Sequence, residues 1–336
     1  MDNGIKNGKI TIGDVADALG ISKTTVSRAI SGKGRIGEET KRKVMEYITE
    51  HNYTPNVIAK GLAQSKTFNI GVVLPADQNL IEQPFFQGCL IGVTESAAAA
   101  DYDVVVTTST ESDISLIKRL VDNRKVDGIL LTRTLRKDNA VKYLKQSGIP
   151  FTVIGSVDDD DIVQVDSNHV GCCSEMTSIL FNCGCKRMAF FCGNLEYSVN
   201  RSRYEGFEQA YSEKKKHPDA KLVFSDLNTK AMIQAATDRV LQNGCDCILC
   251  ADDIICGTVL ARLNQRGVDI PGQIKVASFY NSVYLSNYNP PITAVNIDVR
   301  ELGATAASRL LELIGTGETV KKTKISYDIM MKKSTM

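Results

Sequence analysis

The feature that most restricts the fold is a regular alternation of short apolar runs and helix-length segments between Phe68 and Phe279. The runs are rich in Val, Ile, Leu and Phe, which is typical of strands buried on both faces. Strands that alternate with helices pair in parallel and are covered by helices on both sides, so the pattern predicts doubly wound α/β architecture. The predicted strands are Asn69–Leu74, Asp103–Thr107, Gly128–Leu131, Phe151–Ile154, Ile162–Asp166, Met188–Cys192, Leu222–Ser225, Cys247–Cys250 and Val276–Phe279.

The alternation comes in two similar sets, one before about residue 166 and one after about residue 186. We therefore expect two lobes, each with its own parallel sheet, and a ligand site between them at the carboxyl ends of the strands. The segment Ile292–Asp298 and a final helix predicted over Val299–Ile314 are expected to return to the first lobe. The first lobe then comprises about 68–166 and 292–325, and the second about 167–291.

A different pattern occupies the stretch TIGDVADALGISKTTVSRAIS near the N-terminus. Thr11 is a candidate N-cap with Asp14 three residues later, Gly20 ends this first short helix, and Ser22 is placed to cap a second one. On the second helix, cations and small hydroxyl side chains share one arc, as in helices that enter a major groove. This arc consists of Lys23, Thr24, Ser27, Arg28 and Ser31. The pattern favours a helix-turn-helix, although periodicity alone also fits a helical hairpin with a solvated polar side.

Charge is distributed as a DNA-binding N-terminus requires. Residues 1–66 contain 11 Lys and Arg against 7 Asp and Glu, and the remainder contains 29 against 32, within a chain of net charge +1. We therefore predict a headpiece over 1–54, a hinge or linker over 55–67 and a core over 68–336. The G-x-G-x-x-G match at 32–37 is not interpreted as a dinucleotide loop, because a helix and not a strand precedes it.

Other sequence features indicate a cytoplasmic protein without metal or cofactor. The chain has no export signal and no apolar stretch of 18 residues. Its ten cysteines lie in apolar segments, which favours reduced, buried thiols. The pairs Cys183/Cys185 and Cys245/Cys247 lack the spacing of a zinc site and have no nearby His, so core thiols are favoured over metal ligands. Asp158–Asp161 lacks the pattern of a calcium loop and is interpreted as a solvated turn.

The residues ITIGDVADALGISKTTVSRAISGKG, followed by NYTPN and VIAKGLAQS, closely resemble the headpiece of the lac repressor (LacI/GalR) family of bacterial transcription regulators. D-V-A, G-I-S, T-V-S-R and N-Y-x-P-N stand at the family's spacings, and the resemblance continues to the end of the chain. It implies a homodimer that binds a palindromic operator in double-stranded DNA, with a core like the periplasmic sugar-binding proteins. The implied DNA contacts are Thr11, Ser22, Lys23, Thr24, Thr25, Ser27 and Arg28.

The resemblance also identifies a hinge between headpiece and core. Residues 56–64 are too short to form a stable helix alone. The family's hinge helix forms on the operator, beside its twin from the other subunit, and pushes a leucine into the minor groove. Leu62 matches that leucine, and Asn56 matches the first polar contact of the hinge. A plain linker is the alternative.

Effector residues follow from the resemblance of the core. Phe85 and Phe86 match the two aromatics that follow the first strand, and aromatic faces stack on sugar or base rings. Arg203 in RSRYEGF matches an arginine that usually contacts ligand hydroxyls or carboxylates. Asp252 in CADD stands where relatives have an asparagine or aspartate facing the ligand. For each of these residues, a structural role is the competing interpretation.

Three departures from the family pattern affect the expected ligand. Tyr280 and Asn281 stand where many relatives have two aspartates, Leu227 replaces an aromatic of several sugar and purine binders, and Gly155 replaces an aspartate. A standard hexose or purine is therefore not assured, and a small polar ligand, a sugar or a related metabolite, is expected. The full predicted effector set is Phe85, Phe86, Arg203, Leu227, Asp252, Tyr280 and Asn281.

The sequence thus predicts a ligand-regulated transcription factor, most simply a repressor. The alternatives are a soluble sugar-binding module without a DNA role and a nucleotide-dependent enzyme. No G-x-x-x-x-G-K-[ST] loop occurs in the chain, and no catalytic constellation was found. The headpiece favours the regulator over both alternatives, so no enzymatic activity is expected.

Overall fold

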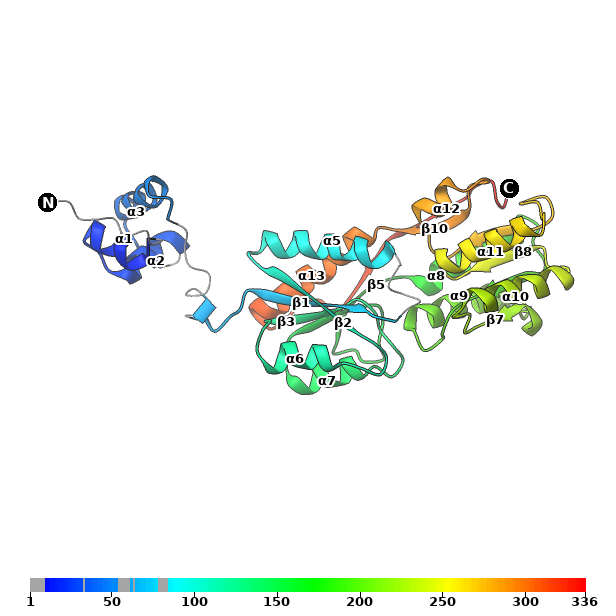
Figure 1. Ribbon diagram of the computed structural model, residues 1–336, viewed down its shortest axis with the longest axis horizontal. Coiled ribbons are helices and arrows are strands. Elements are labelled where there is room, and N and C mark those ends of the chain that lie inside the picture. The colour runs from blue at the N-terminus through cyan, green and yellow to red at the C-terminus, as the bar shows by residue number, and fades with distance from the viewer. Residues whose placement is uncertain (1–9, 33, 54–60, 63, 78–83) are drawn as a thin grey trace. The chain divides into compact units, whose positions relative to one another are not determined.

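The computed structural model describes residues 10–32, 34–53, 61–62, 64–77 and 84–336. The chain divides into two compact units, residues 1–67 and residues 68–336 (Figure 1). The division falls at Phe68, where the sequence changes from helical to strand-forming character.

Helices α1, α2 and α3 form the described part of the first unit, and they span Ile12–Leu19, Lys23–Ser31 and Glu38–Glu50. None of them is long enough to be stable alone, so each depends on packing its apolar side against the other two. Val15 of α1, Val26 of α2 and Val44 of α3 are fully buried in their common core. The turn between α1 and α2 contains Gly20 at φ +65°, a left-handed conformation that glycine adopts without steric cost.

The first lobe of the second unit is built on a parallel sheet with strand order β11-β5-β4-β3-β1-β2. Helices α5 and α13 cover one face of this sheet, and α6 and α7 cover the other (Figure 1). The strands are β1 (Asn69–Pro75), β2 (Asp103–Ser109), β3 (Gly128–Leu131), β4 (Phe151–Ile154), β5 (Val163–Ser167) and β11 (Lys322–Ile325), and the helices are α5 (Pro84–Ala99), α6 (Ser115–Asp122), α7 (Asn139–Ser147) and α13 (Val299–Thr316).

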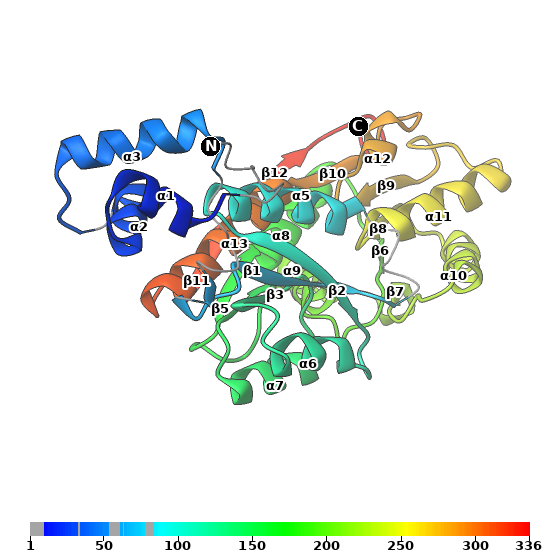
Figure 2. The same ribbon diagram turned by 60° about the vertical axis from the view of Figure 1, so that its left-hand side comes forward.

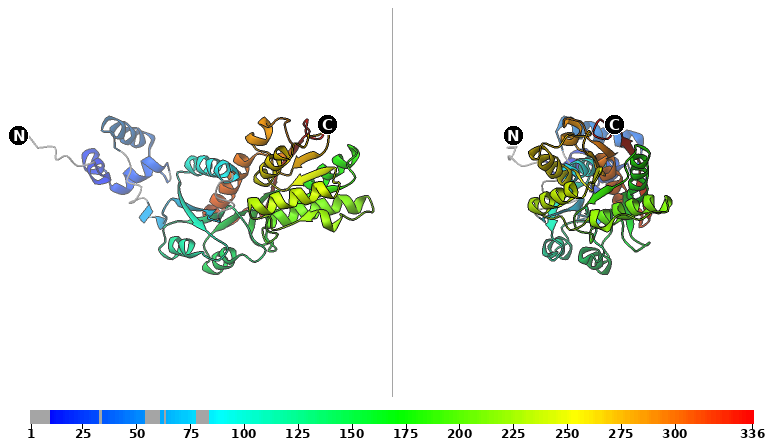
Figure 3. Two further views of the ribbon diagram at one scale, coloured as in Figure 1. Left: turned by 45° about the vertical axis from the view of Figure 1, so that its right-hand side comes forward. Right: turned by 90° about the vertical axis from the view of Figure 1, so that its right-hand side faces the viewer.

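The second lobe has the sheet order β12-β10-β9-β8-β6-β7, parallel except for β12. Helices α8 and α9 pack on one face, and α10 and α11 pack on the other (Figures 2 and 3). The strands are β6 (Met188–Phe191), β7 (Val223–Phe224), β8 (Cys247–Cys250), β9 (Lys275–Ser278), β10 (Thr293–Ile297) and β12 (Tyr327–Met330), and the helices are α8 (His169–Asn182), α9 (Ser198–Glu213), the short 3-10 helix η1 (Ala220–Leu222), α10 (Lys230–Gln242), α11 (Asp253–Gln265) and α12 (Val283–Asn287). The predicted class, a helical headpiece with two doubly wound lobes, is confirmed.

The prediction that Ile292–Asp298 belongs to the first lobe is wrong. Strand β10 pairs in parallel with β9 and antiparallel with β12, so it lies in the sheet of the second lobe. The chain returns to the first lobe only at Asp298, whose side chain caps α13 by accepting a hydrogen bond from the N–H of Glu301. After β11 the chain crosses again, and β12 extends the second sheet.

Helices α5 and α13 approach each other so closely that two positions accept only glycine. A Cβ on Gly92 would lie 2.0 Å from the carbonyl oxygen of Arg300, and one on Gly303 would lie 2.1 Å from that of Cys89. This contact holds the first turn of α5, which carries Phe85 and Phe86, near the first turn of α13, which carries Leu302.

Candidate functional site

Helix α2 presents the predicted DNA-reading residues to solvent. Lys23, Thr24, Ser27 and Arg28 are exposed and Thr25 is half-buried, while Val26 and Ala29 are buried against the other helices. The helix therefore uses its apolar side for folding and leaves its cationic, hydroxyl-bearing side outward. That is the surface chemistry that a helix needs to enter a major groove.

Thr11 and Ser22 are helix caps as well as predicted DNA contacts. The N–H of Asp14 donates to Oγ1 of Thr11 at 3.3 Å, and the N–H of Thr11 donates back to the Asp14 carboxylate at 2.8 Å. Oγ of Ser22 accepts from the N–H of Thr25 at 3.1 Å. Both hydroxyls therefore have a structural role, and any DNA contact they make is additional to it.

Of the two DNA contacts predicted in the hinge, only one belongs to the part of the chain that the structure describes. Asn56 lies outside the described residues. Leu62 is described, and 85% of its surface is exposed. An exposed leucine of this kind contributes little to folding.

A cavity of about 100 Å³, open to solvent at its mouth, lies between the two lobes of the second unit. The first turns of α5 and α13 and the loops after β3 and β4 line it from the first lobe, and the first turns of α8 and α9 and the loops after β8 and β9 line it from the second. Most of these segments are the carboxyl ends of parallel strands and the helix starts that follow them, which is where open α/β sheets bind ligands.

Five of the seven predicted effector residues line this cavity. Phe85 and Phe86 contribute an edge-to-face pair with ring centroids 5.2 Å apart, and Tyr280 from the second lobe faces Phe85 at 6.0 Å. Arg203 and Asp252 line the same space although they are distant in sequence. Aromatic faces and polar groups from both lobes are thus brought around one volume, the arrangement expected for a small ligand with an apolar face and several oxygens.

The structure does not bring the other two residues into the cavity. Leu227 is buried in the apolar core between the second sheet and helices α10 and α11. Asn281 contacts the C-terminal segment, since its Oδ1 accepts from Nζ of Lys332 at 3.3 Å and from Oγ of Ser286 at 3.0 Å. Lys332 of the C-terminal segment therefore binds the Asn281 side chain, which the family pattern would direct at a ligand.

Gly155 lines the cavity where some relatives have an aspartate. Its φ is +116°, and a Cβ there would lie 2.5 Å from Oγ1 of Thr134. An aspartate cannot replace Gly155 without moving Thr134, so any ligand contact at this position falls to the Thr134 side chain or to the backbone.

Several residues of the cavity wall were missed by the sequence analysis. Asp166 and His169 form an ion pair with Nε2 3.1 Å from Oδ1, and Arg133 and Tyr197 face each other from opposite lobes. Asp253 follows the predicted Asp252. The sequence contained a signal for the first pair, since Asp166 lies near the end of predicted strand Ile162–Asp166 and His169 follows three residues later, at the start of a helix with many apolar residues.

Positive and negative side chains are nearly equal in number in the cavity wall, and burial shifts the pKa values of two of the acidic ones. Burial raises the pKa of Asp252 and of Asp253, and Arg203 opposes the rise in both. Asp252 also accepts from the N–H of Ile255 at 2.8 Å as the N-cap of α11. Arg203 is 7% exposed, and its Nε has no hydrogen-bond partner among the described residues. A buried donor without an acceptor is costly, so a ligand oxygen placed there would be favoured.

The described residues contain no cluster of metal ligands and no membrane-spanning helix. Within the described ranges, no group of three or more His, Cys, Asp or Glu is placed to hold a metal ion. The cysteines are free thiols, and all except Cys183 are buried. Asp159 and Asp160 of the acidic turn form ion pairs with Lys145 and Lys322. No helix in the described part of the chain is long and apolar enough to cross a membrane.

Comparison with known proteins gives two family matches. Residues 11–56 match the family described as bacterial regulatory proteins, lacI family, and residues 178–335 match the periplasmic binding protein-like domain. The chain is 30% identical over 322 residues to the HTH-type transcriptional regulator MalR of Streptococcus pneumoniae serotype 4, covering 93% of this chain and 95% of MalR.

Two solved structures extend these matches to the fold. A complex of the transcriptional regulator CelR with cellobiose is similar at a TM-score of 0.74 and 25% identity, covering 97% of this chain and 99% of CelR. The lac repressor dimer bound to operator and the anti-inducer ONPF is similar at a TM-score of 0.79 and 22% identity, covering 98% and 100%. Both the headpiece and the two-lobed core therefore have counterparts in known proteins.

Proposed function

Because the chain belongs to the lacI family of bacterial regulatory proteins and is a DNA-binding transcriptional regulator rather than an enzyme, we propose that it is a repressor controlled by a small polar ligand bound between its two lobes. The ligand is a sugar or a related metabolite, and its binding changes the affinity of the headpiece for an operator. A regulator of bacterial genes works in the cytoplasm, which is the location we propose.

The outward face of α2 carries the DNA part of this proposal. Arg28 and Lys23 are exposed on the same helix as small hydroxyl side chains, while the buried side of the helix packs on α1 and α3. Arg28 reads a base edge, and Lys23 and Thr24 contact bases or neighbouring phosphates. Asn56 and Leu62 extend the contact into the minor groove when the hinge orders on DNA.

The unsatisfied Nε of Arg203 is the single observation that carries the ligand part. It lies in a cavity whose aromatic walls suit the apolar face of a sugar ring and whose carboxylates suit its hydroxyls. Arg133 and His169 are paired with Asp77 and Asp166, so the wall has little excess positive charge to attract an anion. A neutral sugar is therefore favoured over a sugar phosphate, and the CelR complex makes cellobiose a reasonable first probe.

We propose a homodimer whose subunit interface is formed by the core. Several large apolar side chains are exposed there, and a subunit contact would remove them from water. Val283 of α12 is 78% exposed, and Tyr284 beside it is also exposed. Ile254 of α11, Ile91 of α5 and Val106 of β2 are further exposed apolar residues. A symmetric pair of headpieces reads a palindrome, so the operator is expected to be a two-fold repeat.

The proposal is tested first on DNA. The full-length protein is used to select binding sites from a randomised duplex library, and a palindromic consensus is expected. Selected DNA is then titrated in gel shifts with and without cellobiose, maltose, glucose, glucose 6-phosphate and hypoxanthine. A loss of binding with a neutral sugar supports a sugar-released repressor. If no consensus is selected, the proposal of an operator-binding repressor is wrong. If only glucose 6-phosphate or hypoxanthine changes DNA binding, the assignment of a neutral sugar as the ligand is wrong.

A further inference from the structure

Two loops from opposite lobes are joined by backbone hydrogen bonds beside the ligand cavity. The N–H of Arg136 donates to the carbonyl oxygen of Glu196 at 2.8 Å, and the N–H of Ser198 donates to that of Thr134 at 3.2 Å. Leu135 and Tyr197 form an antiparallel bridge between these bonds. We call residues 134–136 and 196–198 the clasp.

The two donor amides depend on the opposite lobe for their acceptors. Ser198 is the first residue of α9, where an N–H has no acceptor within its own helix. Arg136 lies in the loop between β3 and α7, outside any helix or strand. When the lobes separate, both amides face water, so their protection reports directly on the closed clasp.

Arg133 holds side chains of both lobes over the clasp. Nη1 of Arg133 forms an ion pair with Asp77 of its own lobe, and the guanidinium lies 5.1 Å from the ring centroid of Tyr197 on the other lobe. Only 12% of the Arg133 side chain is exposed, so solvent screens these interactions weakly. Burial raises the pKa of Tyr197 although Arg133 opposes it, and a neutral phenol presents its ring face to the cation at ordinary pH.

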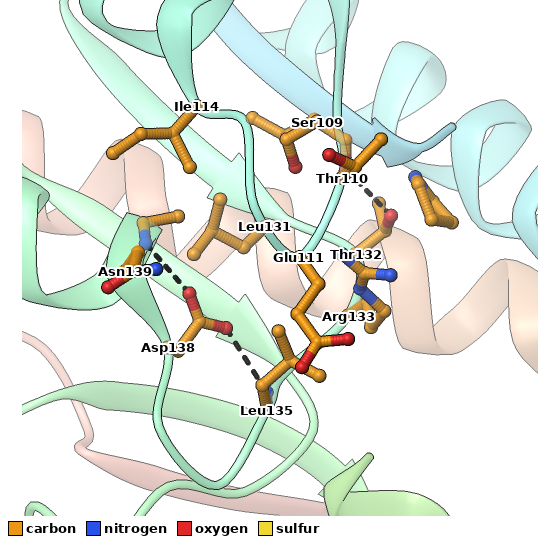
Figure 4. Close-up of a pocket in the computed structure, with 13 residues that line it drawn as sticks. Ser109, Thr110, Glu111, Ile114, Leu131, Thr132, Arg133, Leu135, Asp138 and Asn139 are labelled. Carbon is orange, nitrogen blue, oxygen red and sulfur yellow. Dashed lines mark hydrogen bonds between the residues drawn. The ribbon is translucent and has the colours of Figure 1, made fainter. Parts of the chain in front are cut away.

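The position of Arg133 links the clasp to the ligand site. Arg133 and Thr132 line the main cavity, and they also line a much smaller one, with a volume of about 10 Å³, that is drawn in Figure 4. The smaller cavity lies at the ends of β2 and β3 and is bordered by Ser109, Glu111 and Asp138. Its Asp138 is already bonded, because it accepts from the N–H groups of Leu135 and Ala140. The loop that carries the clasp is thus anchored at Asp138, and Arg133 stands between the two spaces.

We propose that the clasp holds the two lobes together beside the ligand cavity in the ligand-free protein and that Arg133, packed against the Tyr197 ring, is the side chain that maintains this contact. Both hydrogen bonds of Arg133 to described residues come from Nη1, which leaves Nε and Nη2 as donors for an oxygen-rich ligand. Such a ligand competes with Tyr197 for Arg133, so its arrival changes the lobe contact. This last consequence rests on the proposed function, whereas the contact between the lobes does not.

Amide hydrogen exchange on the ligand-free, full-length protein tests the clasp. In wild type, the Arg136 and Ser198 amides are expected to be protected far above the rate of an unstructured peptide. Arg133→Gln should lower the protection of both amides by about tenfold, the factor that corresponds to loss of one partly buried cation–π contact. Amides in α13 should keep their protection. Lys145→Gln, which breaks an exposed ion pair with Asp159 elsewhere in the first lobe, is the matched control and should leave the clasp amides unchanged.

A pair of variants at Tyr197 keeps the test decisive if Arg133→Gln folds poorly. The hydrogen bond from Nη1 to the Tyr197 hydroxyl is long, 3.4 Å, so the ring contributes more than the hydroxyl. Tyr197→Phe should therefore retain most of the protection, and Tyr197→Ala should lose about as much as Arg133→Gln. Unprotected amides in wild type, or equal protection in wild type and in Tyr197→Ala, would overturn the proposal. Neither result depends on whether a sugar is the effector.

Discussion

Nε2 of His169 lies 3.1 Å from Oδ1 of Asp166, and the buried imidazole and the half-buried carboxylate form a pair in the wall of the ligand cavity. Burial alone would lower the pKa of His169, but the Asp166 carboxylate, together with a hydrogen bond to Cys172, outweighs burial and the pKa is raised above 6.5. The opposite ring nitrogen, Nδ1, is buried without a partner among the described residues. The cavity wall therefore contains a cation whose charge is lost as the pH rises through the raised pKa of His169.

Stability should fall as the pH rises through the raised pKa of His169. A folded-state pKa above the unfolded value means that the His169–Asp166 pair stabilises the fold fully below pH 6.5 and that this contribution is lost at higher pH. Urea unfolding of wild type and His169→Gln is compared between pH 6 and pH 8.5. The free energy of unfolding should decrease with pH more steeply in wild type, and parallel curves would mean that His169 does not titrate with folding.

The architecture followed from periodicity because buried strands and amphipathic helices leave strong local patterns. Periodicity did not show to which sheet β10 belongs. A five-residue strand such as Thr293–Ile297 is compatible with either lobe until its neighbours β9 and β12 are known. The strands and the helix-turn-helix were therefore predictable, whereas the crossing point at Asp298 depended on tertiary pairing.

The effector site was only partly predictable for a similar reason. Phe85 and Arg203 lie near the starts of α5 and α9, and Tyr280 lies in the loop after β9, positions that a fold of this kind directs at the cleft. Asn281 occupies such a position too, but Lys332 from the end of the chain engages it. The clasp could not be foreseen, because it consists of backbone groups whose pairing carries no side-chain signature.

Arg203 should be dispensable for stability and required for ligand response. It has no ion-pair partner among the described residues. Arg203→Met relieves the cost of burying its charge, which offsets the loss of a nearby cation for the buried Asp252 and Asp253, so the unfolding free energy should change by less than about 1 kcal/mol. Gel shifts with the sugar that releases wild type should show unchanged operator affinity and no release. Arg262→Met is the contrasting variant, because Arg262 binds Asp238 at 2.9 Å and its loss should lower Tm. Normal release in Arg203→Met would remove this residue from the ligand site.

Arg28 should contribute specificity rather than general affinity. Arg28→Ala is expected to lose about 1–3 kcal/mol on the selected operator and almost nothing on random DNA, because a base contact is sequence-dependent and a phosphate contact is not. Arg42→Ala on α3, where Arg42 pairs with Glu46 at 2.9 Å, serves as a control for general loss of positive charge. Equal losses on both DNAs in Arg28→Ala would reduce Arg28 to a phosphate contact.

The substitution Leu62→Ala tests whether the hinge carries the ligand signal from the core to the headpiece. Its side chain is 85% exposed in the absence of DNA, so Leu62→Ala should leave Tm unchanged. If the leucine wedges between base steps when the hinge orders, its loss should weaken operator binding by a few kcal/mol and reduce DNA bending, since the wedge supports the unstacked step. Affinities and bend angles are measured in gel shifts with circularly permuted operator fragments. Val320→Ala, which truncates another exposed apolar side chain before β11, should alter neither. A wild-type bend in Leu62→Ala would leave this segment as a tether, and the ligand signal would then have to reach DNA through the spacing of the two headpieces alone.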